Sequence, residues 1–296
     1  MANPPIIPGF KLIKQVGDGG MATVWKAWDD ANDRIVAIKL LDDAFAANES
    51  EVSMFHTEER LMEEIRHPGI VQAFGFFKAG EKCFYSMEFV DGYTFGDLLR
   101  RTQHIKESDC LLICESVAAA LDAAWNDHGI VHCDIKPENI MINTEGVVKL
   151  ADLGISHRFE YREGPQDVPE HVLGTPAYIS PEQVYGDIEL DCRSDIYSLA
   201  ATLYHLATGR ILFPGLGNDD MMRAHCDDTT QARDPRSYRP EISESFCRLL
   251  EAMLVKNRDN RIASWADVFE MCQDIESGVR FKVRDTTGAS SSIKLL

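Results

Sequence analysis

The chain has 296 residues, of which 30 are basic and 48 are acidic, and its formal net charge is −18. This length can bury a sizeable core, and the ordinary apolar and charged fractions exclude disorder as the default state. The acidic balance makes nucleic acid and membrane surfaces poor partners, and we interpret it as solubility, with a preference for basic protein substrates as the sharper alternative.

The cysteines and the N-terminus bear on the compartment. Eight cysteines are scattered without a CxxC pair, which argues against a zinc site and fits reduced thiols in a cytosol. The first residues lack a basic start and an apolar stretch, so we expect no signal peptide. No run reaches the ~18 apolar residues of a membrane span. We therefore expect a cytoplasmic chain with no membrane contact.

The first third of the chain alternates in the manner of strands. Residues 10–13, 23–26 and 35–39 predict three strands, and turns rich in Gly, Asp and Asn suggest an antiparallel meander. Residues 51–66 then follow a helical period, and two more strand-like runs lie near 70–77 and 83–89. The face of the helix should carry Met54, Glu58, Leu61, Met62 and Ile65, with Glu59 off it.

Beyond residue 92 the pattern becomes mainly helical. Residues 108–128 predict a helix that ends at Gly129, and strand fragments surround 140–142 and 147–150. A loop-like segment runs from 152 to about 182, and helical patterns follow to 277. The fold class is therefore α+β. The expected divisions are an extension 1–9, a domain 10–276 with lobes of about 10–89 and 93–276, and a flexible tail 277–296.

A glycine-rich segment separates the first two predicted strands. Glycines there let backbone N–H groups approach phosphate oxygens without a Cβ in the way. An ordinary hairpin turn is an equally good interpretation of this segment alone. Ala22 stands where such loops usually have a further glycine, which should be tolerable. The residues concerned are Val16, Gly17, Asp18, Gly19 and Gly20.

Lys39 lies on a strand that otherwise faces the core. Lysine is rarely buried without a partner, so a carboxylate should hold it. Glu58 fits because it shares a helical stripe with Leu61 and Met62. By itself Glu58 would be taken for a solvated carboxylate; the presence of Lys39 favours the pair.

Residues 132–139 are the most specific motif. Asp134, Lys136 and Asn139 fall within six residues, between a predicted helix and a predicted strand. Asp can accept or orient a hydroxyl proton, Lys can neutralise phosphate, and Asn offers a carbonyl to a hard cation. Asp152 follows the next strand and is available to Mg²⁺.

The order of these motifs resembles that of protein kinases: glycine-rich loop, strand lysine, helix glutamate, H-R-D-x-K-P-x-N, D-F-G and A-P-E. The segments 19–21, 174–178 and 180–182 are similar to those of bacterial, eukaryotic-like Ser/Thr kinases. The resemblance covers about residues 10–276. It implies the bilobal kinase fold, with a small β-rich lobe and a larger helical lobe.

The resemblance also implies roles. Lys39, held by Glu58, should contact the α- and β-phosphates of ATP, and Asp134 should be the catalytic base. Lys136 should steady the γ-phosphate. Asn139 and Asp152 should hold Mg²⁺, with Mn²⁺ as an alternative. The adenine site should comprise the gatekeeper Met87 and the hinge residues Glu88 and Val90. Val24, Ala37 and Met141 should sandwich the base, and these three also suit plain core packing.

Other positions match structural or specificity residues of the family. Asp195 corresponds to the helix aspartate that holds the catalytic loop, here residues 132–139, and Glu182 with Arg261 corresponds to a buried ion pair. Lys136, two residues after the base, is typical of Ser/Thr kinases, and Thr175 matches the threonine that bonds the base and this lysine. Family analogy adds homodimers and longer chains with a membrane helix and sensor domain, so this chain is either complete or a fragment at the cytoplasmic side of a membrane.

Cys133 replaces the arginine of H-R-D, which in the family pairs with a phosphorylated activation-loop residue. Cysteine offers phosphate no charge-assisted bond. The loop 155–173 contains no threonine, and its only hydroxyls are Ser156 and Tyr161. We therefore expect activity without activation-loop phosphorylation. A redox-sensitive thiol is the weaker alternative for Cys133.

Three other functions compete with a Ser/Thr protein kinase. A pseudokinase scaffold would bind nucleotide without transfer, but all the catalytic residues are present. A small-molecule kinase would not need residues 174–182, which match the part that docks peptides. A plain interaction module explains none of the motif order.

Overall fold

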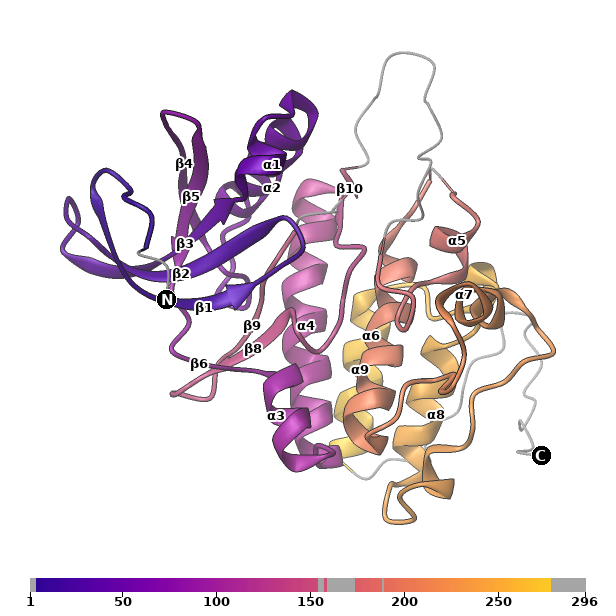
Figure 1. Cartoon of the computed structure of the whole chain (residues 1–296). Coiled ribbons are helices and arrows are strands. Elements are labelled where there is room, and N and C mark those ends of the chain that lie inside the picture. The colour runs from indigo at the N-terminus through magenta and orange to yellow at the C-terminus, as the bar shows by residue number, and fades with distance from the viewer. Residues whose placement is uncertain (1–3, 154–156, 159–173, 188, 278–296) are drawn as a thin grey trace. The chain divides into compact units, whose positions relative to one another are not determined.

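The structure is a computed structural model and describes residues 4–153, 157–158, 174–187 and 189–277 (Figure 1). Contacts divide it into two compact units, which are described separately. Unit 1 comprises 1–94 and 139–156, and unit 2 comprises 95–138 and 157–296. The segment 139–156 thus groups with the N-terminal strands, whereas the sequence placed it in the second lobe.

Unit 1 is built on a five-stranded antiparallel sheet with the order β1-β2-β3-β5-β4. Residues from three of the strands and Ile7, which precedes β1, form a core cluster on it. The first three strands form the predicted meander. The strands are β1 (Phe10–Asp18), β2 (Ala22–Asp29), β3 (Arg34–Leu41), β4 (Ala73–Ala79) and β5 (Lys82–Glu88).

A second, three-stranded sheet in unit 1 has the order β6-β8-β9. Its strands are β6 (Gly92–Thr94), β8 (Ile140–Asn143) and β9 (Val148–Leu150). Leu150 N donates to Gly69 O at 2.7 Å, and Val71 N donates to Leu150 O at 2.9 Å. These bonds tie the end of β9 to the chain before β4, and so fix where the following residues emerge.

Two helices of unit 1 follow β3, the short α1 (Asp43–Ala46) and α2 (Glu49–Glu64). Asn48 caps α2 through a bond from Ser50 N, which satisfies one N–H of the first turn. The predicted face of α2 is wrong at two positions. Met54 is 46% exposed and Phe55 is buried in its place, and Glu59 is buried although it was expected off the face.

Unit 2 is mainly helical (Figure 1). Helix α6 is buried along nearly its whole length and packs against α4 and α8, while α9 packs against α4 and α8. The longer helices are α3 (Phe95–Thr102), α4 (Glu107–His128), α6 (Cys192–Thr208), α7 (Asn218–Cys226), α8 (Glu244–Met253) and α9 (Trp265–Glu276).

The shorter elements of unit 2 include β7 (Ile130–Val131), which pairs with β10 (His157–Arg158), and α5 (Pro181–Val184). Short 3₁₀ turns lie at Pro235–Ser237 and Arg258–Asn260. Strand β10 and helix α5 lie in or at the end of the segment that the sequence predicted as a loop. Among the described helices, none is long and apolar enough to cross a membrane.

Candidate active site

The glycine-rich segment is the turn between β1 and β2 in unit 1. Gly19 N donates to Ala22 O at 3.0 Å and closes the turn. Added Cβ atoms would meet Val24 at Gly17 and Ala22 O at Gly19, but would meet nothing at Gly20. Ala22 is buried and opens β2, so its methyl group is accommodated. The turn is thus kept tight by backbone bonds, while Val16 and Asp18 are exposed beside it.

Lys39 lies at the centre of the polar cluster in unit 1. Its Nζ donates to Glu58 Oε1 at 2.6 Å and to Asp152 Oδ1 at 2.9 Å. Strand β3 supplies the lysine, α2 supplies Glu58, and the chain after β9 supplies Asp152. Tyr85 on β5 donates to the same Glu58 oxygen at 2.7 Å. The structure therefore brings together Lys39, Glu58 and Asp152, which the sequence analysis had selected separately.

One cation facing two carboxylates sets the electrostatics of this cluster. Burial, opposed by Lys39 and reinforced by the charge on Asp152, raises the pKa of Glu58 to about 7. The two carboxylates outweigh the desolvation of Lys39 and raise its pKa. Lys39 is therefore a fixed cation between two carboxyl groups, of which Glu58 takes up a proton more easily than an ordinary glutamate.

Asn139 and Asp152, the expected metal ligands, both lie in unit 1. Asn139 is buried at the start of β8, and Asp152 has a left-handed φ of 67° and a side chain that is 43% exposed. No cluster of three or more acidic, His or Cys side chains that could hold a metal occurs within the described residues. An amide and a carboxylate nevertheless fit Mg²⁺, which is typically held by one or two carboxylates, phosphates and water.

The residues expected around adenine also belong to unit 1. Cross-strand neighbours in the first sheet link Gly17 to Val24 and Ala37 to Met87, and Met141 pairs with Thr94 in the second sheet. The N–H of Glu88 donates to Gln72 O at 2.8 Å, so of its backbone groups only the carbonyl is a candidate for the base. Val90, two residues on, is buried.

Unit 2 holds the other part of the chemistry. Thr175 Oγ1 donates to Asp134 Oδ1 at 2.6 Å, and Lys136 Nζ donates to Asp134 Oδ2 at 2.5 Å and to Thr175 Oγ1 at 3.2 Å. Each of the three side chains thus bonds the other two and they form a closed set, although Thr175 is distant in sequence. A lysine on one oxygen and a hydroxyl on the other fix the orientation of this aspartate.

Asp195 on α6 holds the backbone at the start of the catalytic loop. Asp195 Oδ2 accepts from His132 N at 2.7 Å, and its Oδ1 accepts from Cys133 N at 2.9 Å. Burial raises the pKa of Asp195 to about 6. Cys133 has a φ of 67° and is 2% exposed. A strained residue at this position needs surrounding bonds to hold it, and Asp195 supplies one.

Glu182 and Arg261 form the buried ion pair that the sequence predicted. Arg261 Nη1 lies 2.6 Å from Glu182 Oε1, and the two side chains are 0% and 6% exposed. Ser194 donates to the same Glu182 oxygen at 2.7 Å. The pair joins α5 to the segment before α9 and so fixes the chain that follows Thr175.

Sequence reasoning missed three residues that support the site. Tyr85 bonds Glu58, Gln183 Nε2 donates to Cys133 O at 2.8 Å, and Tyr178 Oη lies 2.7 Å from His205 Nδ1. A capping box at Ser180 and Gln183 was the one local signal for α5. The other contacts join distant parts of the chain and leave no local pattern.

Comparison with known proteins identifies the family. Residues 10–274 match the protein kinase domain. The chain is 31% identical over 270 residues to the "probable serine/threonine-protein kinase PknB" of Lactococcus lactis, covering 90% of this chain and 41% of that protein. It is 30% identical over 276 residues to the "serine/threonine-protein kinase PknA" of Mycobacterium tuberculosis, covering 92% and 62% respectively.

The chain thus spans about two fifths of the PknB relative and about three fifths of the PknA relative. The match runs through both units, from the glycine-rich turn to the last helix of unit 2. The α+β class and the kinase fold expected from the sequence are confirmed. The chain belongs to the protein kinase family, and the two relatives compared above are bacterial proteins named as Ser/Thr protein kinases.

Proposed function

We propose that this chain transfers the γ-phosphate of ATP to Ser and Thr hydroxyls of protein substrates. The observation that carries the proposal is the closed set of Asp134, Lys136 and Thr175. The aspartate is oriented to receive or align a hydroxyl proton, and the lysine beside it can neutralise charge on the transferring phosphoryl group. Catalysis of this kind is mainly positioning and electrostatic stabilisation.

The polar cluster of unit 1 supports the nucleotide side of the proposal. Lys39, fixed by Glu58, would contact the α- and β-phosphates, and the glycine-rich turn offers backbone N–H groups to phosphate oxygens. Asn139 and Asp152 would hold the divalent cation, which when bound neutralises phosphate charge. We take Mg²⁺ as the cation because the donors are an amide and a carboxylate, with Mn²⁺ as the alternative.

The choice of Ser/Thr over Tyr rests on Lys136 and its bond to Thr175. The test is incubation of the purified chain with ATP, Mg²⁺ and a peptide array, with phosphosites read by mass spectrometry. We expect phosphate on Ser and Thr. Phosphate on Tyr alone would contradict the assignment.

Regulation is the finer part of the proposal: the chain needs no activation-loop phosphorylation. Cys133 is buried and carries no charge, so it offers no anchor to a phosphate. Ser156 and Tyr161, the loop hydroxyls, lie outside the described residues. A phosphatase-treated sample should keep most of its activity, and a large loss on treatment would contradict the proposal.

The substrates, oligomeric state, location and domain bounds of the protein are also part of this proposal. Because the chain spans only part of its relatives, the substrates, a homodimer and the cytoplasmic location are expectations for the whole protein. So are the bounds of the domain at 10–276, the extension 1–9 and the tail 277–296. Residues 278–296 lie outside the described residues.

A further inference from the structure

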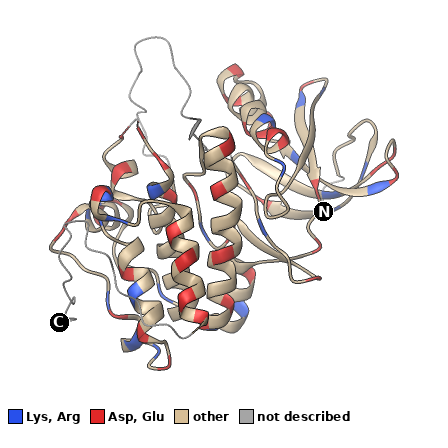
Figure 2. Cartoon of the chain, turned by 180° about the vertical axis from the view of Figure 1, so that it is seen from behind, with Lys and Arg blue, Asp and Glu red and all other residues tan. Residues whose placement is uncertain are grey.

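A basic pocket lies in unit 2, on a chain whose net charge is strongly negative. Figure 2 shows acidic positions spread over the helices, with fewer basic ones. The pocket, by contrast, is lined by three arginines and only one carboxylate, and has a volume of about 610 Å³. This is within the usual range for a pocket that takes a small ligand or side chain. Its charged and titratable lining residues are Arg100, His104, Glu138, His205, Arg210 and Arg239.

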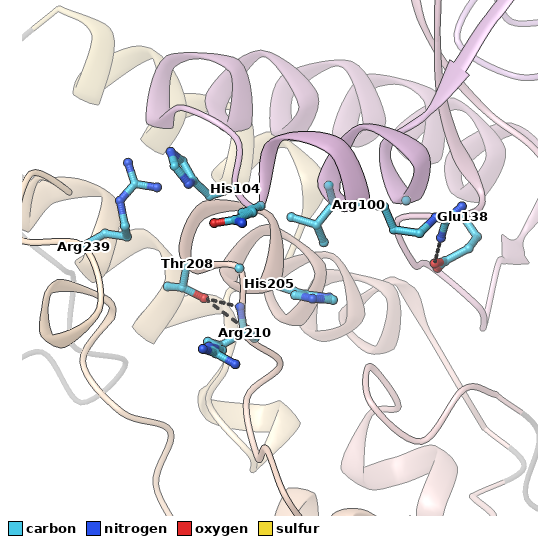
Figure 3. A pocket seen from close by; sticks show the side chains of 11 residues that line it. Arg100, His104, Glu138, His205, Thr208, Arg210 and Arg239 are labelled. Atoms are coloured by element: carbon cyan, nitrogen blue, oxygen red, sulfur yellow. Dashed lines mark hydrogen bonds and ion pairs between the residues drawn. The ribbon is translucent and has the colours of Figure 1, made fainter.

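The pocket is assembled where the ends of α3 and α6 meet (Figure 3). Ile105 N donates to Leu206 O at 2.7 Å, and an added Cβ at Gly209 would lie 2.3 Å from Gln103 O. Gly209 has a φ of 72°, so both its conformation and this close approach require glycine. The shape of the pocket is therefore fixed by backbone contacts.

Hydrogen bonds connect this pocket to the catalytic loop inside unit 2. Gly96 N at the start of α3 donates to Pro137 O at 2.9 Å, and Glu138, four residues after Asp134, lines the pocket. On another wall, His205 Nδ1 lies 2.7 Å from Tyr178 Oη. Tyr178 N in turn donates to Thr175 O at 2.9 Å. These contacts place the pocket beside the segments that carry Asp134 and Thr175, so a residue that flanks the phosphorylated hydroxyl is the natural candidate for its occupant.

The arginines are not all neutralised by the protein. Arg100 faces Asp97 and Glu138, and Arg239 bonds Glu241 through both Nε, at 2.7 Å, and Nη2. Nη1 of Arg239, however, is buried without a hydrogen-bond partner among the described residues. Arg210 has no carboxylate partner among the residues that the structure describes. Its backbone N–H and carbonyl bond the hydroxyl of Thr208. An orphaned buried guanidinium nitrogen calls for an acceptor.

His205 bears on the kind of ligand that the pocket can bind. Burial lowers the pKa of His205 to about 4, so its ring is neutral near pH 7. Burial and nearby carboxylates raise the pKa of Tyr178, so its hydroxyl stays protonated and shares a hydrogen bond with Nδ1 of His205. The arginines therefore supply positive charge to the pocket without any contribution from His205.

A purely structural interpretation explains only part of this. Arginines near the C-terminus of a helix complement its dipole, and Arg100 and Arg210 lie at such ends. That effect accounts for surface charges, but it requires neither an open cavity nor the unpartnered nitrogen of Arg239. Arginine forks match carboxylate and phosphate groups in geometry as well as charge.

We infer that this pocket selects peptide substrates by an anionic side chain, carboxylate or phosphomonoester, at a fixed distance in sequence from the phosphorylated hydroxyl. The inference rests on the proposed protein kinase function and adds its substrate class. It reverses the alternative drawn from composition, because an acidic chain would by charge alone favour basic substrates.

The experiment measures kcat/KM for peptides with one Ser and neutral flanks. A single Glu, phosphoserine or Lys is moved through each flanking position, so that carboxylate and phosphate sources are compared directly. We expect Glu or phosphoserine to raise kcat/KM by about tenfold at one or two neighbouring positions, and Lys to lower it there. A flat profile in peptides that are phosphorylated overturns the inference and leaves the proposed function standing.

Variants assign the effect to the pocket. Arg210→Glu should abolish the preference for Glu and shift it toward Lys at the same position, while Arg239→Gln should weaken it. Arg223→Glu is the matched control, because this substitution makes the same change of charge. Arg223 is exposed on α7 in the same unit and does not line the pocket. A preference that survives in Arg210→Glu, or is lost equally in Arg223→Glu, contradicts the assignment.

A binding measurement keeps the two proposals separable. Fluorescence anisotropy compares a labelled Glu-rich peptide with its Gln counterpart at low ionic strength, on the wild-type chain, Arg210→Glu and Arg223→Glu. Weaker binding of the acidic peptide by Arg210→Glu alone supports the pocket even if no peptide is phosphorylated. Equal affinity of all three proteins for both peptides overturns it.

Discussion

At the scale of single residues, Glu58 and Glu59 form a natural comparison. Both are buried on α2, but only Glu58 touches Lys39. Glu59 has an oxygen without a partner among the described residues, and burial raises its pKa. Adjacent carboxylates with the same burial thus have different tasks, and the difference can be measured.

We predict that Glu58→Gln lowers phosphotransfer by at least about tenfold, because Lys39 loses the carboxylate that orients it toward phosphate. Glu59→Gln, the matched control, should keep activity and raise the free energy of unfolding, since a neutral amide is less costly to bury. Initial rates and urea unfolding of both variants check this. Equal losses of activity in the two variants would refute the role of Glu58.

The buried pair of Glu182 and Arg261 should dominate the stability of its surroundings. Arg261→Met leaves Glu182 buried without its cation and should cost about 3–5 kcal/mol of unfolding free energy. Arg248→Met is the control, because Arg248 pairs with Glu244 on the exposed face of α8 and should cost about 0–1 kcal/mol. Similar shifts of the urea midpoint in both variants would argue against a special role for the buried pair.

At the scale of elements, the second sheet of unit 1 depends on one glycine. A Cβ at Gly92 would lie 1.9 Å from Ile142 O, across the pairing of β6 with β8. Gly92→Ala should therefore cost about 1–3 kcal/mol through displaced backbone. Gly20→Ala, where a Cβ meets nothing within 4 Å, should leave stability nearly unchanged. Thermal unfolding of both tests this; an unchanged midpoint in Gly92→Ala would show that the strands separate freely.

The sequence predicted the long elements well because each carries its own periodicity. Helix α4 was expected to end at Gly129, and Gly129 is its left-handed C-cap. The sequence analysis did not predict strand β6 or helix α3, which have three and eight residues and lie where the strand pattern gives way to the helical one. Phe55 replaces Met54 on the face of α2 because the buried stripe is wider than a single i, i+4 row.

The candidate site could be predicted where its residues fall in one short segment of the sequence. It could not be predicted where the fold brings residues together from distant segments. Asp134, Lys136 and Asn139 fall in one short segment, so their combination is visible in the sequence. The basic pocket could not be foreseen, because Arg100, Arg210 and Arg239 come from separate segments that only the tertiary structure brings together.

At the scale of the whole molecule, buried histidines make stability depend on pH. Burial lowers the pKa of His225 to about 4, with Lys256 nearby adding to the effect, and Tyr197 Oη lies 2.8 Å from its Nδ1. The unfolded chain takes up a proton near pH 6.5, while the folded one resists until near pH 4. Stability from this group is complete above the first value and is lost as the pH falls toward the second.

We predict that His225→Gln is less sensitive to acid than the wild type. Between about pH 7.5 and about pH 5 the stability advantage of the wild type over this variant should shrink by about 2 kcal/mol. The comparison isolates His225 because Asp195, whose pKa is raised to about 6, gains stability over the same range in both proteins. Urea unfolding at the two pH values measures it; a constant difference would contradict the pKa shift.

The central claim is that the two polar clusters of this chain carry out phosphotransfer. The most direct test is transfer of labelled γ-phosphate from ATP to a Ser/Thr protein substrate by the wild type, Asp134→Asn and Asp152→Asn, with folding checked by thermal unfolding. The account predicts incorporation by the wild type, and a loss of at least about a hundredfold in each folded variant. Wild-type incorporation no higher than that of the two variants would contradict it and would favour a scaffold that binds nucleotide without transfer.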